Sequence, residues 1–483
     1  MRSRLFLTVG STLLGSVLLL ASASLPAMAG ARPNEVEDLQ AQPGPYKVED
    51  LRMASGPSPF AGGCPGARFD DMAIAGHELE PAITVNPANP RNLIATWKQD
   101  VGLADQTRSD LVASSLDGGK TWARHTIPGL TVCTGGTADA GSDPWVSAGR
   151  DGSVYFSGLS ADLSTDPPTT AVVASHSNNG GRTWPTPVTV AAPLAGNETD
   201  AVTGSPTLGR HAYLAWANFL LTFPRTNSLE FSRTIDGGAT WSPPVPIDQP
   251  GPFAIDFSPK IVVLPNGTLL AVFARFDAEL GLGTLQAARS LDEGRTWLPA
   301  VQAGSKPVFE FHDPETGALL PQPGFPSTAV APDGTVYIAF EDSRSPSSGA
   351  IGVARSRDGG RTWTRTTVPG VRAFAFEPAI AVDSHGTIGL IWYDLRNDRP
   401  GDAALTADVW FAQSDDRGGS WRQNHVAGPF DLRTALPSVN YVGEYQGLAA
   451  LRGRGFAAIF TVAAPLAKDG PTDILFARIG PAR

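Results

Sequence analysis

The stretch Ser115-Leu-Asp117-Gly-Gly119-Lys-Thr121-Trp122 is the first of six copies of one pattern, Ser/Thr-x-Asp-x-Gly-x-Thr/Ser-Trp. The other copies occupy residues 177–184, 234–241, 290–297, 356–363 and 414–421. The Asp position of each copy is held by Asp117, Asn179, Asp236, Asp292, Asp358 and Asp416, which lie 56 to 66 residues apart. A sequence period of this length predicts a radial array of similar antiparallel sheets.

Each copy has the composition of a tight turn between two strands. An Asp or Asn side-chain oxygen accepts backbone N–H groups a few residues on, and glycine supplies a positive φ. The Trp begins the outgoing strand and covers apolar surface. Because six near-identical copies cannot all form one active site, we interpret all six as structural.

These motifs resemble Asp boxes, also called BNR repeats, and from about Glu78 onward the chain is similar to the sialidase-like β-propeller superfamily. The resemblance implies that the boxes lie between the third and fourth strands of each blade, on the face away from the active site. Sialidases of this family have six blades, whereas other Asp-box propellers with seven blades cleave plant polysaccharides.

Apolar segment pairs precede each box, and a seventh pair, 447–451 with 456–460, follows the last box. The segment 473–477 adds a third strand before the chain ends. The missing fourth strand could come from Tyr46-Lys-Val48, which would remove an exposed sheet edge. We therefore predict an all-β propeller of four-stranded antiparallel blades, seven in number, with six as the alternative.

Residues 1–29 have the pattern of a secretory signal peptide: Arg2 and Arg4, an apolar run, and Ala27-Met28-Ala29. Residues 30–75 would form an N-terminal extension that contributes the closing strand, and residues 76–483 the propeller. We expect a secreted monomer with no membrane-spanning segment after cleavage. In an exported protein the two cysteines, Cys64 and Cys133, predict one disulfide, with two unpaired thiols as the alternative.

The charge of the chain restricts its partners. Removing the leader takes two positive charges and no negative ones from a net charge of −10, which leaves −12. This balance argues against nucleic acid or an anionic membrane as partner, and it disfavours long-range attraction of an acidic sugar. A glycan or glycoconjugate is the expected partner.

Polar side chains gather where first strands start and second strands end, which is the face opposite the boxes. A sialidase needs arginines for the substrate carboxylate, a Tyr–Glu pair as nucleophile and an acid. Arg275, Arg344 and Arg396 occupy similar positions in three consecutive blades and are the predicted substrate-binding residues. The predicted catalytic residues are Asp100 or Asp143 as the acid, with Tyr441 or Tyr445 and Glu444 or Glu377 as the pair. The Asp-x-Arg pairs 342–344 and 394–396 could instead be salt bridges between blades.

Three functions remain open. The first is a sialidase-like glycoside hydrolase, the second a non-catalytic propeller that binds glycans or proteins, and the third a glycosidase that uses two carboxylates. No cofactor is required by any of them. Calcium at the acidic mouth is conceivable because oxygen ligands abound, although no loop has the spacing of a dedicated site.

Overall fold

The structure is a computed structural model that describes residues 46–68, 70–102, 106–220, 226–306, 311–313, 315–318, 320, 325–342, 350–371, 374–435 and 442–481. Residues 1–29 of the predicted leader, Tyr441 and Arg344 lie outside the described residues. The described part is all-β apart from three short 3₁₀ helices, η1 (Asp70–Met72), η2 (Val132–Thr134) and η3 (Leu432–Thr434). Within it no helix is long and apolar enough to span a membrane.

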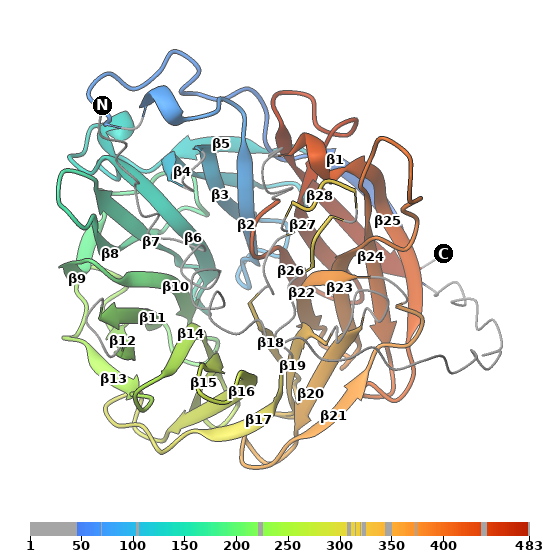
Figure 1. Ribbon diagram of the computed structural model, residues 1–483. Coiled ribbons are helices and arrows are strands. Elements are labelled where there is room, and N and C mark those ends of the chain that lie inside the picture. Colours follow the sequence, from blue (N-terminus) through green and yellow to red (C-terminus); the bar gives the residue numbers. More distant parts are fainter. Residues whose placement is uncertain are drawn as a thin grey trace.

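The strands form one eight-stranded and five four-stranded antiparallel sheets (Figure 1). The eight-stranded sheet has two halves that are joined only by the pair Thr107–Gly141. One half contains β2 (Glu78–Val85), β3 (Leu93–Val101), β4 (Thr107–Ser115) and β5 (Ala123–Thr126). The other contains β6 (Ala140–Ala148), β7 (Val154–Asp162), β8 (Thr169–Ser177) and β9 (Val188–Leu194).

Four sheets follow in chain order, each built from four consecutive strands. They comprise β10 (Asn197–Gly204), β11 (Ala212–Leu220), β12 (Thr226–Thr234) and β13 (Val245–Asp248); then β14 (Ala254–Val263), β15 (Leu269–Asp277), β16 (Leu282–Ser290) and β17 (Val301–Ser305). The next two comprise β18 (Ser327–Val330), β19 (Val336–Glu341), β20 (Ile351–Ser356) and β21 (Thr364–Thr367); then β22 (Ala375–Val382), β23 (Ile388–Asp394), β24 (Thr406–Ser414) and β25 (Arg422–Asp431).

The last sheet joins the two ends of the described chain. Its strands β26 (Gly447–Ala450), β27 (Phe456–Ala463) and β28 (Thr472–Pro481) are completed by β1 (Tyr46–Met53), which pairs antiparallel with β28. The N-terminal strand covers the edge that β28 would otherwise expose. In Figure 1, β1 accordingly lies at the rim of the molecule beside β28.

The sheets surround a centre. The first strand of each group lies nearest to it, and we call these seven strands, β2, β6, β10, β14, β18, β22 and β26, the inner strands (Figure 1). The apolar core lies between neighbouring sheets, where large side chains such as Trp97, Trp216 and Trp392 are fully buried. This packing fixes the positions of the inner strands around the centre.

All six Asp boxes form the same hydrogen-bonded turn. In the first box, Ser115 Oγ donates to Asp117 Oδ1 (2.8 Å) and accepts from Gly119 N (2.9 Å), while Thr121 N and Oγ1 donate to the two Asp117 oxygens (3.0 and 2.7 Å). These bonds lower the pKa of Asp117 to about 2, with the Thr121 hydroxyl contributing most. The corresponding bonds recur around Asn179, Asp236, Asp292, Asp358 and Asp416.

Candidate functional site

The inner strands share a break at one position. Glu80, Asp143, Thr199, Ser258 and Glu377 have φ between 50° and 57°, and at each of them the register with the next strand shifts. A proline follows four of the five, and proline cannot donate to the ladder. Positive φ is costly for residues with a Cβ and is concentrated at functional sites. The break therefore sets carboxyl and hydroxyl side chains at one level of five inner strands.

A buried ion pair joins the first two breaks. Lys98 Nζ lies 3.0 Å from Glu80 Oε2 and 3.7 Å from Asp143 Oδ1, and the Lys98 side chain is only 1% exposed. Asp143 also accepts hydrogen bonds from Ser142 Oγ (2.6 Å) and from the backbone N–H of Thr199 (2.9 Å). Asp143 thus lies beside a cation and accepts two hydrogen bonds.

Glu377 occupies the opposite kind of environment. Its side chain is buried, and neither carboxyl oxygen has a hydrogen-bond partner among the described residues. Burial raises the pKa of Glu377 well above its usual range, and the charges of Glu341, Glu80 and Glu444 raise it further. Its backbone is held by a bond from Glu377 N to Glu341 Oε1 (2.8 Å) and one from Gln446 Nε2 to Glu377 O (2.6 Å). The Glu377 carboxyl thus favours its protonated form.

Two further acids lie near this cluster. Asp110 on β4 and Asp200 on β10 are buried, and their carboxyl oxygens accept no hydrogen bond within the described ranges. Burial raises the pKa of both well above the usual range of aspartate. Neither residue was among the predicted site residues. Asp200 is one of the acidic residues that precede a first strand, as Asp143 and Glu377 are, whereas no local pattern marks Asp110.

Of the two predicted tyrosine nucleophiles the structure describes Tyr445, whose hydroxyl contacts a backbone carbonyl. Tyr445 Oη donates to the backbone carbonyl of Pro144 (3.1 Å), and its ring lies 5.3 Å from that of Trp145. Burial raises the pKa of Tyr445 well above 10, which makes its phenolate harder to form. Glu444 is half-buried, and its charge acts on Glu377. Catalytic roles for Tyr445 and Glu444 stay predictions.

Arg275 is engaged by carboxylates. Its Nε and Nη2 lie 2.6 and 2.7 Å from the two oxygens of Asp256, which is its register partner across β14 and β15, and Asp248 contacts it as well. In this bidentate arrangement Asp256 occupies the Arg275 N–H groups that a substrate carboxylate would need.

Arg396 is engaged in the same way. It binds Asp394 through Nε (2.9 and 2.8 Å) and Nη2 (2.5 Å), its Nη1 donates to Gln423 (3.0 Å), and its guanidinium carbon lies 3.9 Å from the Trp410 ring centroid. The pair 394–396 therefore forms a salt bridge, although it joins the last residue of β23 to the turn after that strand rather than two neighbouring blades. A substrate-binding role for Arg275, Arg344 and Arg396 stays a prediction.

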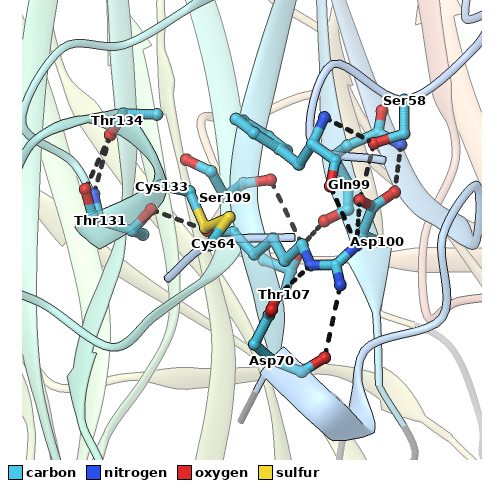
Figure 2. The surroundings of a disulfide bond; sticks show 12 residues. Ser58, Cys64, Asp70, Gln99, Asp100, Thr107, Ser109, Thr131, Cys133 and Thr134 are labelled. Atoms are coloured by element: carbon cyan, nitrogen blue, oxygen red, sulfur yellow. Dashed lines mark hydrogen bonds and ion pairs between the residues drawn. A yellow bond between two sulfur atoms is a disulfide. The ribbon is translucent and has the colours of Figure 1, made fainter. Parts of the chain in front are cut away.

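Asp100 anchors the N-terminal segment. Its carboxyl accepts hydrogen bonds from Ser58 Oγ (2.7 Å), Gly76 N (2.9 Å), Gln99 Nε2 (2.9 Å) and Arg108 Nη1 (3.0 Å), as Figure 2 shows in part. The predicted disulfide between Cys64 and Cys133 is confirmed and lies beside this network (Figure 2). With four donors bound, Asp100 holds the segment before β2 against the first sheet, and the structure places it in this network rather than with Asp143 and Glu377.

A cavity of about 140 Å³ lies at the centre of the molecule. Every inner strand contributes to its wall, through Ala82, Trp145, Thr203, Lys260, Ser327, Ala379 and Gly447. Phe325, Tyr445 and Gln446 line it as well. We call this cavity the axial chamber. Pro378 directly follows the break at Glu377, and Trp145 lies two residues after the break at Asp143. Asp143 and Glu377 are therefore close in sequence to residues of the chamber wall.

Lys260 is the site residue that sequence reasoning missed although the sequence carries a signal for it. The stretch Ser258-Pro259-Lys260 repeats the pattern of Glu80-Pro81 and Glu377-Pro378 at the same point of its strand. The second residue after such a break reaches the chamber wall in Trp145, Lys260 and Ala379 alike. Among the described residues no group of three or more His, Cys, Asp or Glu could hold a metal ion, and calcium binding stays a prediction.

Comparison with known proteins identifies a fold. No family model matches the chain, and no curated protein matches it. A crystal structure of a protein of unknown function from Dyadobacter fermentans is similar, with 12% identity, a TM-score of 0.52 and coverage of 90% of this chain and 99% of that one. At this identity the likeness shows the fold alone.

Glycoside hydrolases are also among the similar structures. The Hadza microbial sialidase Hz136 shares 16% identity over 81% of this chain and 74% of its own, with a TM-score of 0.43. An α-L-arabinanase from Penicillium chrysogenum shares 15% over 70% of this chain and 92% of its own, with a TM-score of 0.44.

Proposed function

We propose that the protein is a glycoside hydrolase in which Glu377 is the proton donor and Asp143 the second catalytic carboxyl group. The observation that carries the proposal is the buried, unpartnered carboxyl of Glu377 at a strained backbone position. Glycosidases use two carboxyl groups, one of which is held neutral so that it can donate a proton. Glu377 and Asp143 occupy equivalent breaks of β22 and β6, and Asp143, unlike Glu377, has a cation and hydrogen-bond donors beside its carboxyl.

The substrate we propose is a neutral glycan rather than a sialoside. Sialidases bind the substrate carboxylate through arginines, and Arg275 and Arg396 already bind Asp256 and Asp394. An anionic substrate would have to displace these aspartates. The net charge of −10, or −12 without the leader, also works against an acidic sugar.

We further infer that the propeller has seven blades and is exported as a monomer. The two halves of the eight-stranded sheet are joined by a single pair, so each half supports one blade, and the other five sheets supply one each. Export is supported by the sequence pattern of residues 1–29 and by the disulfide. No cofactor enters the proposed chemistry.

Turnover assays test the proposal. Purified mature protein would be incubated with chromogenic glycosides of neutral sugars, with plant polysaccharides and with a fluorogenic sialoside. We expect hydrolysis of a neutral glycan and a loss of about 10²- to 10⁴-fold in kcat for Glu377→Gln and for Asp143→Asn. The matched control Glu279→Gln changes an exposed glutamate in the turn after β15 and should leave kcat unchanged.

Three outcomes would overturn the proposal. Full activity in Glu377→Gln would exclude this residue as the proton donor. Hydrolysis confined to the sialoside would favour the arginine-dependent chemistry instead. An absence of turnover with measurable glycan binding would support the non-catalytic propeller.

A further inference from the structure

The axial chamber is lined by the amine of Lys260. Lys260 is 8% exposed, and its Nζ lies 3.4 Å from the Trp145 ring centroid and 5.6 Å from that of Tyr445. The contacts found for this nitrogen among the described residues are with these two rings. An ammonium has three donors, and buried polar groups are nearly always hydrogen-bonded. The aromatic faces stabilise the charge but leave these donors to a ligand.

An unused acceptor lines the same chamber. Gln446 is 4% exposed, and its Nε2 is fixed by the bond to Glu377 O. Its Oε1 has no partner in the described part of the chain. A ligand that satisfies both Lys260 and Gln446 must accept one hydrogen bond and donate another, and hydroxyl groups do both.

The charges around Lys260 favour a neutral ligand. The acids that act on its ammonium are Asp200 on β10, Asp143 on β6 and Glu80 on β2, and Lys98 pairs with the last two. Burial lowers the pKa of Lys260 to about 7, so near neutral pH this amine carries only part of a positive charge, and three acidic side chains already act on it. A ligand carboxylate would add an uncompensated buried charge, which is costly.

The dimensions of the chamber limit the ligand to one ring. Its volume of about 140 Å³ is close to the roughly 150 Å³ of an apolar cavity that binds benzene. Trp145, Tyr445 and Phe325 give it aromatic walls on which the C–H face of a ring can pack.

We infer that the axial chamber is a binding site for a single neutral sugar ring, with Lys260 donating to its hydroxyl oxygens and Gln446 accepting from a hydroxyl. This binding goes beyond the proposed cleavage, because it requires neither Glu377 nor Asp143 to be catalytic.

Isothermal titration calorimetry tests the inference, with D-glucose, D-galactose and L-arabinose as neutral probes and D-glucuronate and benzoate as anionic ones. At least one neutral sugar should bind with a dissociation constant on the order of 1 mM, and more tightly than either anion. Lys260→Met should weaken that binding at least about tenfold. Lys120→Met, a matched change at an exposed box lysine, should not alter it.

A second variant separates loss of the site from loss of the fold. Ala379→Leu fills the chamber from β22 without removing a charge and should abolish binding, whereas Glu377→Gln should keep binding even if it removes turnover. The inference is overturned if no neutral sugar binds, if glucuronate or benzoate binds more tightly, or if folded Lys260→Met and Ala379→Leu proteins bind like the wild type.

Discussion

At the residue scale, the box position of Asn179 shows how one turn tolerates two side chains. In the other boxes a Thr or Ser hydroxyl donates to the second carboxylate oxygen, as Thr121 does to Asp117. In the second box the direction is reversed, and Asn179 Nδ2 donates to Thr183 Oγ1 (2.7 Å). The oxygen that accepts the backbone N–H groups is present in both, so Asn preserves the turn.

This reversal makes a prediction about Asp117. Asp117→Asn should change the free energy of unfolding by less than about 0.5 kcal/mol, because the amide can repeat the bonds of Asn179. Asp117→Ala should cost about 1 to 2 kcal/mol, because Thr121 N and Ser115 Oγ lose their acceptor. Urea unfolding of both variants measures the difference. Equal losses in the two variants would show that the side-chain oxygen is not what holds the turn.

Some single residues of the site could be predicted from the sequence, and others could not. The acidic residues that start the inner strands were selected because strand direction places them on one face, and Asp143 and Glu377 lie at equivalent breaks. The partner of Arg275 could not be read from spacing, since Asp256 is opposite it only in the register of β14 and β15. Asp100 was likewise ambiguous, because Ser58 and Arg108 reach it from separate segments.

At the element scale, the boxes join neighbouring sheets as well as strands. Gly119, with φ +93°, faces the ring of Phe476 on β28, and a Cβ at this glycine would lie 2.2 Å from that ring. The adjoining Trp122 packs edge-on against the same ring at 5.4 Å. Gly294 and Trp297 repeat this arrangement against Phe231 of the preceding sheet. The box glycine is therefore required for close packing between sheets as well as for the turn.

A pair of substitutions separates these two requirements. Gly386, with φ +84° in the turn between β22 and β23, has open space where its Cβ would lie. Gly386→Ala should therefore cost about 1 kcal/mol, the conformational cost alone. Gly119→Ala should cost about 3 kcal/mol, because the clash with Phe476 is added. Thermal or urea unfolding measures both, and equal losses would contradict a packing role for Gly119.

The folding elements were more predictable than their contacts. The boxes and the apolar strand pairs are local patterns, and the strands lie where those patterns placed them. The chamber depends on seven inner strands meeting at a centre, which no local pattern encodes. The one sequence signal for it is the residue–proline break, which recurs at Glu80, Asp143, Ser258 and Glu377.

At the scale of the whole molecule, two groups of carboxyls act in opposite directions on stability. Box aspartates such as Asp117 and Asp292 have a pKa lowered to about 2 by hydrogen bonds to Thr121 and Thr296. Their contribution is complete above the unfolded pKa of about 4 and is lost as the pH falls toward 2. Buried carboxyls such as Glu78, Asp110, Asp200 and Glu377 have raised pKa values, so the folded state keeps protons that the unfolded state releases.

We therefore expect the melting temperature to be highest in mild acid, near pH 4 to 5. Below about pH 4 the box aspartates of the unfolded chain bind protons that the folded state does not bind, and from about pH 5 to 7 the buried carboxyls make folding progressively less favourable. Burial lowers the pKa of Lys260 to about 7, so above pH 7 this residue makes the folded state more stable as the pH rises. The prediction therefore concerns pH values below 7. Calorimetry from pH 2 to 7 tests it, and Glu377→Gln should flatten the fall between pH 5 and 7. A melting temperature that rises steadily from pH 4 to 7 would contradict this balance.

The proposed chemistry depends on the Glu377 carboxyl, which must stay protonated beside the chamber at neutral pH. Difference infrared spectroscopy of wild type against Glu377→Gln observes this proton directly. We predict that the wild type shows the carbonyl stretch of a protonated carboxylic acid at neutral pH and that the variant loses this band. If the variant instead loses only the stretch of an ionised carboxylate, Glu377 is charged, and the proposed proton donor and the chemistry built on it are wrong.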